Sequence, residues 1–220
     1  MKTLVIAPHP DDELLGCGGT LLRRKKEGGS IGWLVVTGIS TETGWSGDDV
    51  RRREREITEV RERMGFDALF SLGLPPARLD TLPLGDVVTL IGAAFREYQP
   101  DEILLPHRGD VHSDHRVVFE AVSACTKWFR YPSVRRVLAY ETLSETGFAL
   151  ARDDAFVPNY FVDIGAQLED KLALMSIYSS ELGRFPFPRS IEALRALAAV
   201  RGAESGSAAA EAFELLRERT

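Results

Sequence analysis

Short apolar runs alternate with amphipathic segments along the first part of the chain, and this alternation limits the folds that it can adopt. The apolar runs, which predict short buried strands, cover residues 4–7, 31–36, 68–70, 103–105 and 136–140. Between them lie segments with apolar side chains at helical spacing, for example residues 50–64 and 87–98. Strands that alternate with helices pair in parallel. The sequence therefore predicts an α/β fold, a Rossmann-like three-layer sandwich with a mostly parallel central sheet.

The remaining third of the chain gives a weaker pattern. Residues 143–158 show mixed turns without a clear period, and residues 185–188 form a rigid, proline-containing break. The elements predicted here are a strand at 160–164 and helices at 168–178, 191–201 and 208–219. We expect one domain that spans residues 1–220, with a helical C-terminal segment from about residue 190 that either covers or flanks the functional site or forms a dimer surface.

Composition and charge narrow the classes of protein to which this chain can belong. The net charge of −6 argues against a broad surface for nucleic acid or anionic membrane, which needs an excess of basic residues. No apolar stretch approaches the roughly 20 residues that span a bilayer, and residues 1–3 lead directly into a strand rather than a signal-peptide core. Cys17 and Cys125 lack metal-site spacing and are interpreted as buried apolar residues. We expect a cytoplasmic protein with no nucleic-acid partner and no membrane span.

A histidine and three acids follow the first predicted strand, in the stretch Pro8 to Glu13. Two prolines flank His9 and keep this backbone out of a sheet ladder, at the strand end where open α/β sheets bind ligands. Asp11 or Asp12 alone would be interpreted as a helix N-cap, but a cap needs one acid and no histidine. His9 and Asp12 are close enough in sequence to hold one metal ion, and this donor pair suits zinc or another divalent metal.

The other three histidines of the chain lie within ten residues, 106–115, directly after the predicted strand at 103–105. In a parallel sheet the carboxyl ends of the strands share one edge, so these histidines are expected near His9. A solvated loop would more often use lysine, glutamate or serine. The joint arrangement therefore predicts that the missing ligands of the metal site come from this second stretch.

Two further stretches bear on what the chain binds. The glycines at 16, 18 and 19 do not have the G-x-G-x-x-G spacing of a dinucleotide-binding loop, so we attribute them to close packing of a helix on the sheet. The loop of residues 37–49 leaves the second strand at the same edge as His9, and such loops carry specificity. Trp45 in this loop either stacks on a sugar ring or folds back as a plug.

These motifs together resemble those of the LmbE-like or PIG-L family of metal-dependent N-deacetylases. The resemblance rests on residues 9–13 (His-Pro-Asp-Asp-Glu), residues 16–20 (Gly-Cys-Gly-Gly-Thr) and the His-x-Asp-His motif at 112–115. It extends to residues 161–164, Lys171, residues 178–180, residues 201–202 and residues 210–213, and so covers nearly all of the chain.

The resemblance implies a role for each motif residue. His9, Asp12 and His115 become the metal ligands, and Asp11 becomes the general base. His112, oriented by Asp114, would stabilise the oxyanion and protonate the leaving amine. The family also implies substrate contacts from Arg53, which lies three residues before Glu56, and from an acid near Asp80. Asp110 occupies the place where the family often has an aromatic residue two positions before the first histidine of His-x-Asp-His, and we include it among the candidate substrate contacts.

Two histidines and one aspartate leave a coordination position for water, as in catalytic zinc sites, and the same ligands suit Fe²⁺. The predicted function is removal of an N-acetyl group from a small N-acetylated sugar conjugate of the N-acetylglucosamine type, with release of acetate and a free amine. One alternative is a non-catalytic sugar- or nucleotide-binding module on the same fold, which would have lost ligands or base. Another is a non-haem iron oxygenase, whose ligands usually lie on a β-rich scaffold. A homo-oligomer remains compatible with these features.

Overall fold

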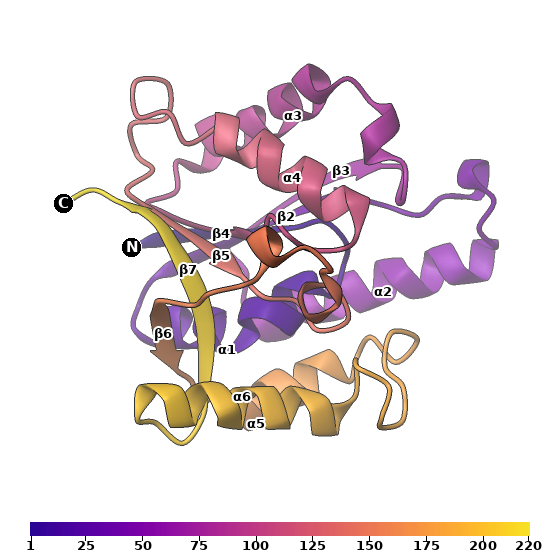
Figure 1. Cartoon of the computed structure of the whole chain (residues 1–220). Coiled ribbons are helices and arrows are strands. Elements are labelled where there is room, and N and C mark those ends of the chain that lie inside the picture. Colours follow the sequence, from indigo (N-terminus) through magenta and orange to yellow (C-terminus); the bar gives the residue numbers. More distant parts are fainter.

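The computed structural model describes residues 1–220 and contains a seven-stranded sheet with the order β3-β2-β1-β4-β5-β7-β6 (Figure 1). Five strands are parallel: β1 (Lys2–Ala7), β2 (Ser30–Thr37), β3 (Ala68–Leu74), β4 (Glu102–Pro106) and β5 (Arg136–Tyr140). The last two, β6 (Tyr160–Asp163) and β7 (Ala210–Glu218), are antiparallel to their neighbours. The predicted α/β fold with a mostly parallel sheet is confirmed.

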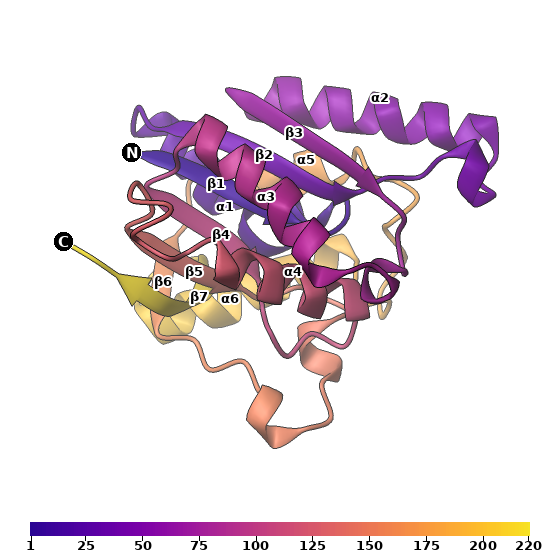
Figure 2. The ribbon, with the colours of Figure 1, turned by 90° about the horizontal axis from the view of Figure 1, so that it is seen from above.

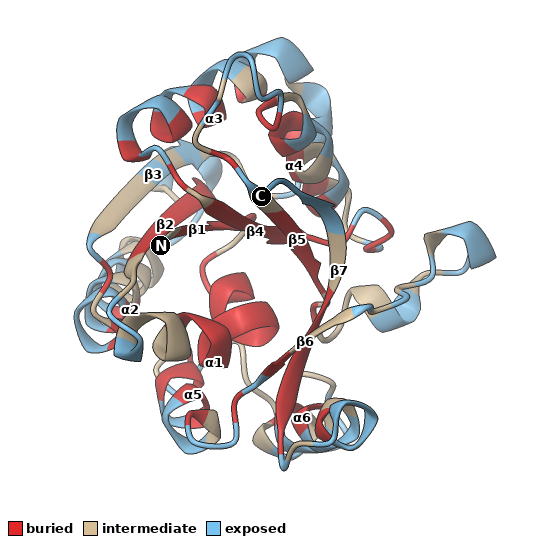
Figure 3. Ribbon diagram, turned by 90° about the vertical axis from the view of Figure 1, so that its left-hand side faces the viewer, coloured by how far each residue is buried: buried red, intermediate tan, exposed pale blue.

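Helices cover both faces of this sheet and make three layers (Figure 3). One face carries α3 (Leu84–Tyr98) and α4 (Ser113–Ala124), which cross the parallel strands in Figure 2. The other carries α1 (Asp12–Lys26), α2 (Gly47–Met64), α5 (Leu168–Met175) and α6 (Ile191–Ser205). Short 3-10 helices lie at Thr41–Thr43, Leu79–Thr81, Thr146–Phe148 and Arg152–Asp154. None of the helices combines the length and the apolarity needed to cross a bilayer.

The apolar runs of the strands supply side chains to both layers, because successive residues of a strand point to opposite faces. In β1, Leu4 and Ile6 join the cluster beneath α3 and α4, whereas Val5 and Ala7 join the cluster beneath α1 and α5. The expected close packing of helix on sheet is confirmed at Gly16, where an added Cβ would overlap the ring of Tyr140. This contact draws the first turns of α1 against the sheet.

The helix predicted at residues 208–219 is wrong, because this segment forms β7 and lies between β5 and β6. Its alanines, leucines, glutamates and arginines are good helix formers, but the sheet overrides this local preference. Ala212 and Phe213 are buried in the strand, and α6 packs on it. The C-terminal segment is therefore a helix followed by a strand of the central sheet.

The strand order places the ends of β1 and β4 side by side. Val5 of β1 pairs with Trp33 of β2 on one side and with Leu104 of β4 on the other. The chain thus leaves β1 toward one half of the sheet and later returns to the other half. In open α/β sheets, ligands bind in the crevice at such a switch point, and here both histidine-containing stretches reach it.

Candidate active site

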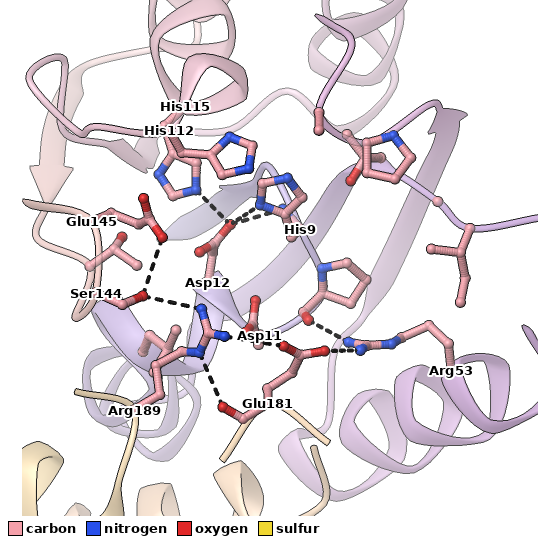
Figure 4. A pocket seen from close by; sticks show the side chains of 18 of the residues that line it. His9, Asp11, Asp12, Arg53, His112, His115, Ser144, Glu145, Glu181 and Arg189 are labelled. Carbon is pink, nitrogen blue, oxygen red and sulfur yellow. Dashed lines mark hydrogen bonds and ion pairs between the residues drawn. The ribbon is translucent and has the colours of Figure 1, made fainter. Parts of the chain in front are cut away.

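His9, Asp12 and His115 come together at the carboxyl ends of β1 and β4 (Figure 4). His9 follows β1, Asp12 begins α1, and His115 lies in the first turn of α4. Asp12 Oδ2 is 3.3 Å from His9 Nδ1 and 3.3 Å from His115 Nε2. One ligand atom from each of the three residues lies within 4.8 Å of the others. The predicted ligand set is therefore assembled in one place.

A carboxylate holds the far ring nitrogen of each ligand histidine. Asp110 Oδ2 is 2.8 Å from His115 Nδ1, and Asp114 Oδ2 is 3.0 Å from His9 Nε2. Such contacts fix the orientation of a metal-binding imidazole and leave its other nitrogen for the cation. The donor set and its supporting carboxylates thus fit a divalent metal such as zinc or ferrous iron.

The excess of negative charge around the two ligand histidines would also favour a bound cation. Burial alone would lower the pKa of His9, but its hydrogen bonds with Asp114 and Asp12 raise that pKa to about 9. Burial likewise opposes a proton on His115, yet Asp12 and Asp110 raise its pKa. Three carboxylates around two imidazoles form an anionic pocket, and in the protein without metal it draws protons onto the histidines.

The structure places two of the predicted site residues differently. Asp110 was expected to contact substrate, but it is fully buried and bonds to His115 and to the hydroxyl of Thr146 (2.6 Å). Asp114 was expected to orient His112, but its carboxylate binds His9. His112 Nδ1 instead accepts the backbone N–H of Asp114 at 3.1 Å.

The Asp114 carboxylate also binds the backbone of the loop that precedes α3. It accepts the backbone N–H groups of Ala77 and Leu79, at 2.7 and 3.1 Å. Ala77 lines the cavity beside the histidines. Asp80, a predicted substrate contact, lies one residue beyond Leu79 but is exposed and does not line this cavity. The loop therefore reaches the site through its backbone rather than through the predicted acid.

Asp11 occupies the N-cap position of α1, but its side chain does not cap the helix. The side chain instead lines the cavity next to the ligand cluster. The capping alternative considered for this residue is wrong, because its side chain makes no cap hydrogen bond. The residue is 6% exposed. Its burial, together with the charges of Asp12 and Glu181, raises the pKa of Asp11 to about 8. A carboxylate so placed has a strong affinity for a proton, and a bound cation would favour its ionised form.

The cavity has a volume of about 230 Å³ and two unlike walls. We call His9, Asp12, His112 and His115 the histidine wall, and Ser144, Glu145, Glu181 and Arg189 the loop wall. Trp45 and Arg53, which were predicted to contact substrate, also line the cavity, and Trp45 is 45% exposed. In Figure 4 the three histidines lie above Asp11, and Glu181 and Arg189 lie below it, whereas Glu145 lies beside the histidines.

Ion pairs and hydrogen bonds join the loop wall to the rest of the site. Arg53 donates to the carbonyl of Pro10 at 2.8 Å and pairs with Glu181. Arg189 donates from Nη1 to Ser144 Oγ and from Nε to the carbonyl of Glu181, both at 3.1 Å. Arg53 is thus held by the Pro10 carbonyl and by Glu181.

Sequence reasoning missed the whole loop wall. Ser144 and Glu145 follow the carboxyl end of β5, and that position was a signal available from the predicted strand. Glu181 and Arg189 belong to the connection between α5 and α6, for which periodicity and motifs offered no signal. Tyr178, at the start of that connection, belonged to the C-terminal resemblance but had no predicted role.

A doubly wound sheet with a histidine and carboxylate cluster at its switch point defines a class, α/β proteins with a candidate metal site beside a ligand cavity. Residues 4–126 match the family described as "PIG-L: GlcNAc-PI de-N-acetylase". The match spans more than half of the chain, and this protein belongs to the PIG-L family.

Known relatives agree with this assignment along the whole chain. Diacetylchitobiose deacetylase from Thermococcus kodakarensis is 29% identical over 229 residues, which cover 98% of this chain and 83% of the relative. Among solved structures, the conserved protein TT1542 from Thermus thermophilus has a TM-score of 0.80 and 30% identity, with 99% and 96% of the two chains covered. N,N'-diacetylchitobiose deacetylase from Pyrococcus horikoshii shares the fold, with a TM-score of 0.77, 23% identity, and 98% and 84% of the two chains covered.

Proposed function

We propose that this protein is a metal-dependent N-deacetylase that hydrolyses the acetamide of a small N-acetylated sugar conjugate. Its family and its deacetylase relatives support the reaction, and one further relative is the 2'-N-acetylparomamine deacetylase of Streptomyces fradiae. The observation that carries the proposal is the position of Asp11. This carboxylate lies beside the ligand cluster, lines the cavity and is not used as a helix cap.

His9, Asp12 and His115 would hold the metal, for which we propose zinc, with ferrous iron also suited to these ligands. When bound, the metal would polarise the amide carbonyl and make a water molecule more acidic. Asp110 and Asp114 keep the two imidazoles turned so that His115 Nε2 and His9 Nδ1 remain available. The protein's own contribution is therefore a rigid set of donors next to a free carboxylate.

Asp11 acts as the general base in this proposal. It accepts a proton from the water whose oxygen attacks the acetamide carbon. When the bond between carbon and nitrogen breaks, the same proton can pass to the nitrogen, so that a neutral amine and acetic acid are formed, and the acid then ionises to acetate and a proton. Burial of Asp11, which raises its pKa, favours this temporary protonation.

His112 stabilises the negative charge that develops on the carbonyl oxygen. Because its Nδ1 accepts the N–H of Asp114, the proton of the neutral ring lies on Nε2. That N–H can donate a hydrogen bond to the oxyanion. Burial, together with the neighbouring His9 and His115, lowers the pKa of His112 and favours the neutral ring.

The substitution Asp11→Asn tests the proposal, because asparagine keeps the shape and tolerates the backbone conformation of this residue. We expect acetate release to fall by about a hundred- to ten-thousandfold, with metal content unchanged. The assay is a fluorescamine screen for freed amine over a panel of N-acetylhexosamine conjugates, with the metal identified in the same preparation. Near-normal turnover by this variant would show that Asp11 is not the base.

A further inference from the structure

Asp11 has a backbone conformation that is unusual for any residue except glycine. Its φ is 138° and its ψ is −29°. At positive φ the Cβ of a non-glycine residue crowds its own backbone, so surrounding groups must hold such a residue in place. On one side this is done by Leu14 and Leu15, whose backbone N–H groups donate to the Asp11 carbonyl at 2.9 Å.

Glu13 holds the other side of Asp11. One oxygen of its carboxylate accepts the backbone N–H of Asp11 at 3.0 Å, and the second accepts the hydroxyl of Tyr178 at 3.1 Å. Glu13 and Tyr178 are both fully buried, and Glu13 has no ion-pair partner. Removing a carboxylate from water without a countercharge is unfavourable, so this arrangement points to a task beyond packing.

We propose that Glu13, supported by Tyr178, is a positioning residue that keeps Asp11 from acting as a helix cap. An aspartate at this position with ordinary cap dihedral angles would turn its side chain toward the free N–H groups of the first turn. By binding the Asp11 N–H itself, Glu13 holds the strained backbone and leaves the Asp11 carboxylate directed to the cavity. The inference rests on the proposed role of Asp11 as the base.

The test compares two buried carboxylates that accept backbone N–H groups. Glu13 accepts the N–H of Asp11, the residue at the N-cap position of α1, and Glu211 accepts N–H groups within α1. Glu211 is 5% exposed and accepts the N–H groups of Gly19 and Thr20, but it contacts no residue of the cavity. We expect Glu13→Leu, which removes the acceptor of the Asp11 N–H, to lower kcat about tenfold to a hundredfold, with KM within about twofold and metal content unchanged. Tyr178→Phe should lower kcat less, about threefold, because the Asp11 N–H keeps its acceptor. The control Glu211→Gln should lower Tm without changing kcat.

Two outcomes would overturn the role of Glu13: a wild-type kcat for metal-loaded Glu13→Leu, or a fall in kcat only in proportion to lost metal. This failure is separate from failure of the proposed function. If Asp11→Asn is inactive while Glu13→Leu is fully active, the base stands and only the positioning role is wrong. If Asp11→Asn is active, the base assignment itself is wrong.

A measurement of stability tests the strain without any activity. If residue 11 is held at positive φ, Asp11→Gly should have a higher Tm than Asp11→Ala, the reverse of the usual order for these residues. Glu13→Leu should also lower Tm less in the Asp11→Gly background than in the wild type, because glycine needs no support. An alanine variant that is as stable as the glycine variant would contradict the proposal.

Discussion

The histidine wall and the loop wall of the cavity are built in different ways. The first consists of residues in the turns and helix starts that follow β1 and β4, and the parallel topology alone brings these strand ends together. The second comes from the connections that follow β5 and α5, and it is held by contacts such as those of Arg189 with Ser144 and Glu181. If the proposed function holds, we expect the sheet ends to carry the chemistry and the connections to select the substrate.

The strongest test of this division is to remove a ligand from the histidine wall. His115→Ala should abolish metal binding and lower kcat/KM by on the order of a thousandfold or more. The matched control is His107→Gln, because His107 is also buried but bonds to Glu214 and to the carbonyl of Asp154, away from the cluster. Metal content by mass spectrometry and acetate release are measured together. Equal metal loss in both variants would contradict the assigned ligand set.

A substitution of Asp110, which supports the ligand histidine His115, should lower metal affinity less than removal of the ligand itself. Asp110→Asn keeps the shape of the side chain that binds His115 but removes its charge, so metal affinity should fall about ten- to a hundredfold. Competition with a chelator measures this affinity. Asp80→Asn, on the exposed side of the preceding loop, should leave affinity and activity as they are. An unchanged affinity in Asp110→Asn would show that His115 needs no such support.

Changes in the loop wall should affect substrate binding rather than chemistry. Glu145→Gln is expected to raise KM about tenfold, with kcat within about threefold and metal content unchanged, because the lost contact is one charged hydrogen bond. Steady-state kinetics on the best sugar conjugate of the panel provide the measurement. If kcat falls and KM does not, the two walls do not divide the work as proposed.

The smallest expected effect is on the stability of the protein after its metal has been removed. The pKa of His9 is raised to about 9, so its contribution is complete below pH 6.5 and is lost as pH rises through 9. The raised pKa of Asp11, about 8, acts in the same direction, because its buried carboxyl group loses a proton in this range. Metal-free protein should therefore lose several degrees of Tm between pH 6.5 and 9. A constant Tm over this range would contradict these shifts.

The sequence was sufficient for the parallel half of the fold and for the histidine wall. Apolar runs bounded by turns identified β1 and β4, and the histidines that follow them are rare enough in this chain to stand out. β7 escaped prediction because its residues favour a helix, and only its pairing with β5 and β6 makes it a strand. Local pattern carries no information on such long-range pairing.

The orientation of individual side chains was less accessible than their proximity. The resemblance paired Asp114 with His112, two residues before it. In the structure the Asp114 carboxylate instead binds His9 and the backbone N–H groups of the loop that precedes α3. Asp110 was assigned to the substrate because it occupies the place of an aromatic residue in the family motif, but it is enclosed between His115 and Thr146. Which partner a buried carboxylate takes depends on the packed structure, which neither spacing nor resemblance specifies.

The hydrogen bond between Thr146 and Asp110 has a consequence for how this site can evolve. Thr146 also accepts the backbone N–H of Thr142, so the turn that presents Ser144 and Glu145 is fastened to the support of a ligand histidine. New preferences can arise by exchange of the two side chains at the tip of the turn. Lengthening or shortening the turn would displace Thr146 and so disturb the support that Asp110 gives to His115. Inherited variation here should therefore favour substitutions over insertions.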